Sequence, residues 1–206
     1  MEDEKRTKIL EAATKVFAEK GFQYAKITDV VKESGISTGM IYTYFRNKLD
    51  ILLSIIVLFL QRINQLNQDK LQSLDDPKQK LLAVLHNFEA LLIKDDKSLT
   101  LVKVLNEALP HIVLIPEKDL QEKRQEIIEG NQKLINRIDK IILEGQQKGV
   151  FNDTLNYSVL RQMLCGAIEM LIYGLFFQRY SKEAIGYEQD EAHKAVSQLI
   201  DRFICK

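Results

Sequence analysis

The sequence predicts an all-α protein of about nine helices, and three observations support this class. Helix-forming residues dominate the 206-residue chain, which contains only 3 prolines and 9 glycines. Apolar residues recur at three- and four-residue spacing over most of its length, which is the period of an amphipathic helix. No segment alternates Val, Ile and Thr with polar residues in the manner of a strand.

The N-terminal part of the chain predicts three short helices. Apolar spacing indicates the first helix at residues 5–20, and Gly21 supplies its C-terminal stop. The second helix is expected at residues 26–34, ended by Gly35, and the third at residues 37–45. A tight glycine turn between the second and third helices is typical of a helix-turn-helix motif.

The rest of the chain predicts longer helices. Asn47 is a plausible N-cap for the fourth helix, and the Asp76-Pro77 pair marks the start of the fifth. The expected helices cover residues 47–73, 77–93, 99–109, 117–148, 155–180 and 189–204. We therefore expect a first domain at residues 1–48, extending into the fourth helix to about residue 63, and a second domain at residues 49–206.

Composition narrows the class of protein. The chain has 29 basic and 29 acidic residues, so its net charge gives no sign of nucleic-acid binding. The N-terminus has no signal-peptide core, and the longest apolar run, residues 163–177, is too short for a membrane span and contains Glu169. We expect a cytoplasmic protein that does not bind membranes, with no cofactor and, since its 3 histidines are scattered, no metal.

A polar and aromatic segment at residues 33–48 carries the strongest functional signal. Small residues at the start of its helix would let the backbone approach DNA, while hydroxyl groups and the helix N-terminus bind phosphate. Met40, Ile41 and Phe45 are expected to pack on the two preceding helices. The candidate DNA contacts are Lys26, Thr28, Ser37, Thr38, Gly39, Tyr42, Thr43, Tyr44 and Lys48, flanked by Arg46. Taken alone, both tyrosines could instead be core aromatics.

The stretch "ILEAATKVFAEKGFQYAKITDVVKESGISTGMIYTYFRNKLDIL" resembles the N-terminal domain of the TetR family of transcriptional regulators. The family pattern Gly-x-x-Tyr-x-Tyr-Phe-x-x-Lys is matched from Gly39 to Lys48. The resemblance implies a homodimeric regulator, most often a repressor, that binds a palindromic double-stranded DNA operator. Family members often carry Thr where this chain has Ala25 and Lys26, so Lys26 would replace a phosphate contact and Thr28 would cap the second helix.

The dimer is expected to form through the last two helices. Each shows more apolar surface than one intramolecular contact requires, and a two-fold operator requires a two-fold protein. The candidate interface residues are Leu160, Leu164, Leu171, Leu175, Val196, Leu199 and Phe203.

A small, mainly apolar effector is expected among helices four to eight. Its candidate lining is Leu60, Phe88, Leu105, Met163, Glu169, Met170 and Tyr173. The segment "KITDVVKESG" is similar to fatty-acid-responsive members of the family, which implies long-chain acyl-CoA as effector. The coenzyme A head would then require cations, for which Arg62, Lys123, Arg124 and Arg137 are available.

Other interpretations remain open. One is a multidrug-type pocket in which Glu169 balances a cationic compound, although Glu169 could also be an interface carboxylate. Another is a helical interaction module with a helix-turn-helix in shape only. An enzyme would require paired carboxylates or a nucleophile beside a base, and Glu169 has no such partner in the sequence, so we do not expect one.

Overall fold

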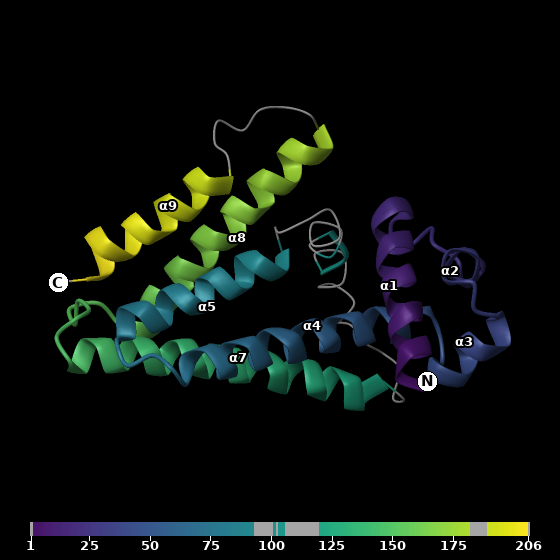
Figure 1. Cartoon of the computed structure of the whole chain (residues 1–206), viewed down its shortest axis with the longest axis horizontal. Helices are drawn as coiled ribbons and strands as arrows, with labels where there is room; N and C mark the ends of the chain where they lie inside the picture. The colour runs from purple at the N-terminus through teal and green to yellow at the C-terminus, as the bar shows by residue number, and fades with distance from the viewer. Residues whose placement is uncertain (1, 93–100, 102, 106–119, 182–188, 206) are drawn as a thin grey trace. The chain divides into compact units, whose positions relative to one another are not determined.

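The computed structural model describes residues 2–92, 101, 103–105, 120–181 and 189–205 (Figure 1). Within these ranges the chain is helical and contains no strand, which confirms the predicted all-α class. A short π-helical turn, Ile200–Ile204, follows the last α-helix. The α-helices are α1 (Glu2–Lys20), α2 (Ile27–Ser34), α3 (Thr38–Tyr44), α4 (Lys48–Leu71), α5 (Pro77–Leu92), α7 (Gln121–Gln147), α8 (Tyr157–Ser181) and α9 (Gln189–Leu199).

Two predicted segments fall largely outside this description. The helix expected at residues 99–109 and the start of the one expected at residues 117–148 lie mostly among residues that the structure does not describe. The other predicted helices have observed counterparts whose ends differ by a few residues.

The chain folds into two compact units. The first contains Met1–Arg62 and Asp95–Asn131, and the second contains Ile63–Lys94 and Gln132–Lys206. Both α4 and α7 therefore contribute residues to each unit. The domain division predicted at residue 48 stays a prediction, because compactness alone does not define a functional domain.

The first unit is built around a buried apolar cluster. Phe17 from α1, Val30 from α2 and Ile41 from α3 are almost completely buried in it. Phe45, directly after α3, joins the same cluster. Because these residues recur at helical spacing, they hold α1, α2 and α3 together on their apolar faces.

Local signals fix the turn between α2 and α3. Gly35 adopts a left-handed φ of +67°, a conformation that a side chain would strain, and its N–H donates to the Val31 carbonyl. Ser37 then caps α3, because its Oγ accepts a hydrogen bond from the Met40 N–H at 3.4 Å. The structure thus confirms the predicted helix-turn-helix geometry.

The second unit contains α5, α8 and α9, and α8 runs side by side with α9 (Figure 1). Charged pairs tie its helices together. Lys80 of α5 binds Glu144 of α7 at 2.8 Å, and Arg161 of α8 binds Asp139 of α7 at 2.8 Å. Gly145 of α7 lets the Phe151 side chain pack directly on the α7 backbone, since a Cβ at this position would lie 2.0 Å from the Phe151 ring.

By length and composition, two described helices could cross a membrane: α4, and Tyr157–Leu175 of α8. Within its most apolar window α4 is 56% buried, as is usual for the core helix of a globular protein. The corresponding window of α8 is only 22% buried, so a single copy of the chain leaves most of that apolar surface uncovered.

Candidate nucleic-acid interface and effector region

The outer face of α3 carries the predicted DNA-reading residues. Thr38, Gly39, Tyr42 and Thr43 are all exposed, while Ile41 faces the core. A Cβ placed on Gly39 would meet no atom within 4 Å, so this helix end is open to a large partner. The arrangement offers small residues and hydroxyl groups on one accessible surface, as a phosphate-binding helix end requires.

The two candidate tyrosines differ in their environment. Tyr42 exposes 52% of its surface, which rules out the interpretation as a core aromatic. Tyr44 is half-buried against the core, and its ring centroid lies 6.4 Å from that of Phe45. The first is free to contact DNA, whereas the second also packs within the protein.

Lys48 corrects one expectation, because its ammonium group binds the protein itself. Nζ donates to the carbonyls of Phe22 at 2.6 Å, Gln23 at 3.1 Å and Ala25 at 2.9 Å. An ammonium has three N–H donors, so these bonds use all of them. Burial lowers the pKa of Lys48. The residue therefore fastens the α1–α2 loop to α4 and has no donor left for phosphate.

The start of α2 corrects another expectation. The helix begins at Ile27, which places Thr28 inside the first turn and excludes it as the cap. Lys26 is the N-cap residue, and the Asp29 carboxylate in the first turn accepts its N–H at 3.0 Å. A hydrogen bond from Lys20 at 2.6 Å lowers the pKa of Asp29, with the Lys26 N–H contributing. The Lys26 side chain remains exposed beside α2.

A buried carboxylate, Asp50, holds the segment between α3 and α4 in place. Asp50 is 3% exposed, and its Oδ2 accepts the Arg46 N–H at 2.8 Å. The Lys123 ammonium of α7 forms an ion pair with Asp50 Oδ1 and lies 5.7 Å from the centroid of the Phe45 ring. α7 thus contacts the segment that joins α3 to α4. The sequence shows no sign of this pair, since its members lie 73 residues apart.

The predicted effector lining is divided between the two units. Leu60 and Leu105 pack with the core of the first unit, whereas Phe88 belongs to the second. On α8, Met163 is 62% exposed and Met170 is 71% exposed. The other two predicted lining residues of α8, Glu169 and Tyr173, are also exposed. These four α8 residues are therefore exposed in a single copy of the chain, and their role in effector binding stays a prediction.

The predicted dimer residues divide into two groups. Leu160, Leu164 and Val196 are buried within the chain, so Leu160 and Leu164 in particular are core residues. Leu171, Leu175 and Leu199 are half-buried, and the Phe203 side chain lies outside the described residues.

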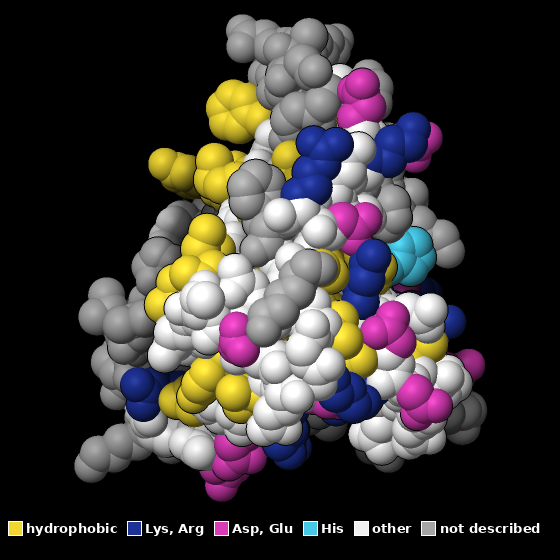
Figure 2. Space-filling model, turned by 90° about the vertical axis from the view of Figure 1, so that its left-hand side faces the viewer, with side chains coloured by type: hydrophobic (Ala, Val, Ile, Leu, Met, Phe, Trp, Pro, Cys, Tyr) yellow, Lys and Arg dark blue, Asp and Glu magenta, His cyan; other side chains and the backbone are white. Residues whose placement is uncertain are grey.

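The exposed apolar face of α8 contains none of the residues predicted for the dimer interface. It consists of Val159, Met163, Met170, Tyr173 and Phe177, which recur at helical spacing. Beside it, an apolar groove of about 460 Å³ runs between α8 and α9 and is lined by Leu164, Ala167, Ile168, Met170, Leu171, Ala195, Val196 and Leu199. Exposed hydrophobic side chains also gather toward one edge of the face shown in Figure 2.

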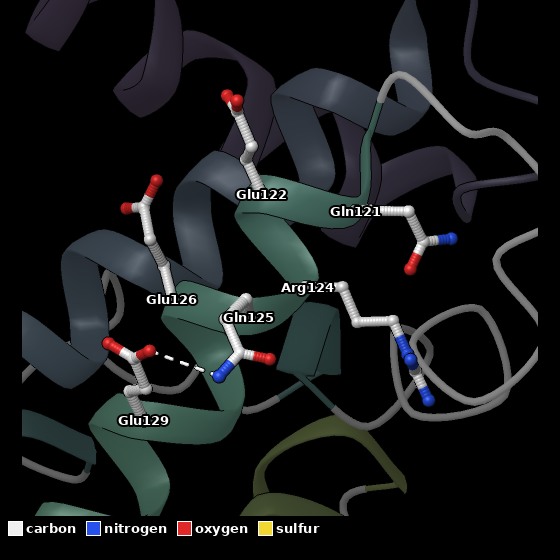
Figure 3. A pocket seen from close by; sticks show the side chains of 6 residues that line it. All are labelled: Gln121, Glu122, Arg124, Gln125, Glu126 and Glu129. Carbon is white, nitrogen blue, oxygen red and sulfur yellow. Dashed lines mark hydrogen bonds between the residues drawn. The ribbon is translucent and has the colours of Figure 1, made fainter.

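The four candidate cations have different surroundings. Lys123 is used by Asp50, and Arg62 is exposed. Arg124 borders a depression of about 580 Å³ on α7 that also contains Glu122, Glu126 and Glu129. Figure 3 shows that these side chains leave α7 in different directions and do not converge. The excess of carboxylates makes this depression unsuitable for an anionic ligand.

Arg137 is placed differently, in a polar cluster of the second unit. Its Nη1 donates to the Asn64 carbonyl at 3.2 Å and to Asn64 Oδ1 at 3.0 Å. One turn further along α4, Asn67 is completely buried, and its Oδ1 accepts the Asn87 Nδ2 of α5 at 2.8 Å. α4, α5 and α7 thus together supply a small polar cluster within the second unit.

The cysteines are free thiols, and burial is the main cause that raises the pKa of both Cys165 and Cys205. A raised pKa keeps a thiol protonated and poorly nucleophilic at neutral pH. In the described ranges, no three His, Cys, Asp or Glu side chains come close enough to hold a metal ion.

Family models match both parts of the chain. The model for bacterial regulatory proteins of the tetR family matches residues 9–55, and the model for the C-terminal region of YsiA-like proteins matches residues 58–181. The fatty acid metabolism regulator protein of Bacillus subtilis is 31% identical over 168 residues, which cover 80% of each chain.

Two solved structures share the fold at 26% identity. The fatty acid degradation regulator FadR from Bacillus halodurans has a TM-score of 0.74, and the match covers 95% of this chain and 94% of the other. FadR from Bacillus subtilis, solved in complex with stearoyl-CoA, has a TM-score of 0.72 with coverages of 94% and 96%.

Proposed function

The chain belongs to the tetR family of bacterial regulatory proteins, a DNA-binding transcriptional regulator by descent, and we propose that it is a homodimeric repressor released by long-chain acyl-CoA. The single observation that carries the effector is similarity along most of the chain to a FadR protein solved with stearoyl-CoA. The relatives named above are regulators, so the function lies in binding and not in catalysis.

The proposed DNA contact is the outer face of α3 with its flanking residues. Ser37, Thr38, Gly39, Tyr42 and Thr43 are accessible there, and Lys26 offers an exposed cation at the start of α2. Hydroxyl and backbone N–H groups position a helix on phosphate, whereas base edges set the sequence that is read. A neutral overall charge is compatible with this mode, because the contacts depend on local geometry.

The proposed dimer uses the exposed apolar face of α8 together with α9. A single chain leaves this apolar surface exposed to water, and a symmetry mate that packs on it would bury it. A two-fold dimer places two reading helices in successive major grooves, roughly 34–36 Å apart, so the operator is a palindrome. Such a protein acts where the DNA is, in the bacterial cytoplasm.

Release follows from differential binding. An effector that prefers a dimer with the wrong spacing of its reading helices lowers operator affinity by its preference for that state. A coupling of about 1–3 kcal/mol, or roughly 5–150-fold, is typical. The multidrug alternative receives no support, since the proposed counter-charge Glu169 is exposed.

A mobility-shift assay with DNA from upstream of the protein's own gene tests this function. We expect binding by the parent protein, strong weakening by Tyr42→Ala, and release by stearoyl-CoA but not by coenzyme A alone. Tyr42 is exposed, so its truncation should leave the helical circular dichroism unchanged. Release by a lipophilic cation with no response to acyl-CoA would refute the effector, and equal binding by Tyr42→Ala would refute the reading surface.

A further inference from the structure

The polar cluster around Arg137 contains an uncompensated cation. Arg137 is half-buried, and among the described residues its hydrogen bonds come from Nη1 alone, to the two oxygens of Asn64. None of the ion pairs in the described ranges includes Arg137, so this guanidinium has no carboxylate partner there. Burial lowers the pKa of Arg137. A guanidinium that is partly withdrawn from water without an anion is an unfavourable arrangement, and it stays protonated.

Asn67 shows a second unmet requirement nearby. Its side chain is completely buried, and its Nδ2 has no hydrogen-bond partner in the part of the chain that the structure describes. Only its Oδ1 is satisfied, by the Asn87 amide. Buried donors are nearly always paired, so an orphan N–H calls for an acceptor that the polypeptide does not provide.

The two groups lie close to each other through Asn64. Residues three apart on a helix share one face, so Asn67 lies beside the Asn64 side chain that Arg137 binds. Both unmet groups are donors, and the cluster has a net positive charge. Leu81, Val84, Ile138 and Ile141, on the helices that supply its polar residues, are buried apolar residues.

We propose that Arg137 and Asn67 bind the anionic, acceptor-rich polar group of the effector, with Asn64 and Asn87 holding them in position. This inference rests on the proposed acyl effector and adds the site of its polar end. That anionic group is either a phosphate of coenzyme A or, for a free fatty acid, the carboxylate end of the chain, and both present oxygen atoms that accept from N–H donors.

The remaining candidate cations fit this role less well. Lys123 is already paired with Asp50, and Arg124 lies among three glutamates. An alternative occupant of the Asn67 site is a buried water, which could satisfy one N–H but would not compensate the charge of Arg137. The two explanations predict different responses to an anionic ligand.

The test compares three probes of equal chain length: stearoyl-CoA, stearate and the uncharged alcohol. Their affinities are measured by titration calorimetry on the full-length parent, Arg137→Gln and Asn67→Asp. Asn67→Asp keeps the oxygen that accepts from Asn87 and replaces the orphan N–H with an anion. Arg124→Gln, which removes a cation from the outer face of α7, is the matched control.

We expect each cluster variant to bind an anionic probe at least about tenfold more weakly, while the alcohol and Arg124→Gln bind as in the parent. Thermal melting and effector-free operator binding identify any variant that fails to fold. A loss confined to stearoyl-CoA assigns the site to a phosphate, and a loss with stearate as well assigns it to the end of the chain. Unchanged affinities in folded variants overturn the inference but leave the proposed function intact, whereas a parent that binds no acyl probe refutes both.

Discussion

Lys48 shows how one side chain can support DNA binding without contacting DNA. Its ammonium group donates hydrogen bonds to three backbone carbonyls of the α1–α2 loop, those of Phe22, Gln23 and Ala25. It also lies 4.6 Å from the centroid of the Phe22 ring. The lysine thus closes the α1–α2 loop from the first turn of α4.

Lys48→Met should therefore lower the stability of the protein by about 1–3 kcal/mol, because the carbonyls lose a charged donor. The slope of log operator affinity against log salt should not change. Lys26→Met is the matched control: that side chain is exposed, so its loss should leave stability unchanged and reduce the slope by about one. Urea unfolding and salt titration measure the two quantities, and a shallower slope for Lys48→Met would restore the phosphate contact.

At the scale of elements, α7 holds the junction of α3 and α4 through the ion pair of Lys123 and Asp50. The same carboxylate accepts the Arg46 N–H, and the Asn47 side chain accepts the Asp50 N–H at 2.8 Å. The pair is buried on the acidic side, with only 5% of the Asp50 side chain exposed. Removing the cation leaves a buried carboxylate uncompensated.

A double-mutant cycle tests this connection. Lys123→Met should destabilise the protein by about 3–5 kcal/mol, whereas adding Asp50→Asn should recover much of that loss because the buried charge is gone. Asn at position 50 still offers an oxygen to the Arg46 N–H. As a control, Lys15→Met breaks an exposed pair with Glu33 and should leave the stability close to that of the parent. Additive effects in the cycle would show that the pair contributes nothing.

At the scale of the whole molecule, the exposed face of α8 indicates a partner. Met163 and Met170 are among the most exposed large hydrophobic residues of the described chain. Because Met side chains adapt to irregular surfaces, they suit a helical interface between two copies. The half-buried Leu199 borders the groove beside this face.

Met170→Glu and Leu199→Glu should each convert the dimer to a monomer and abolish tight operator binding, since a charge would be buried in the interface. Because Met170 is exposed in one chain, its variant should keep the thermal stability of the isolated fold. Gln79→Glu adds the same charge on the exposed surface of α5 and should leave the dimer intact. Sedimentation measures the outcome, and a dimer of unchanged affinity in both variants would exclude this interface.

These scales also show what the sequence could predict. The C-terminal ends of α1 and α2 follow from Gly21 and Gly35, and the start of α3 follows from Ser37, because these signals act on their own neighbours. Long-range pairings such as Lys123 with Asp50 have no local signal. Periodicity identified α8 as apolar but could not tell whether Leu160 or Met163 meets its own chain or another one.

The continuity of α4 restricts how this protein can change over time. No loop interrupts the helix between Arg62 and Ile63, where the two compact units divide. Inserting one residue in a helix turns all that follows by about 100° and moves it by about 1.5 Å, whereas a surface loop would absorb the insertion. Steps of about seven or eleven residues, two or three helical turns, restore the angular phase to within about 20°. We therefore expect α4 to tolerate substitutions much better than single-residue insertions or deletions.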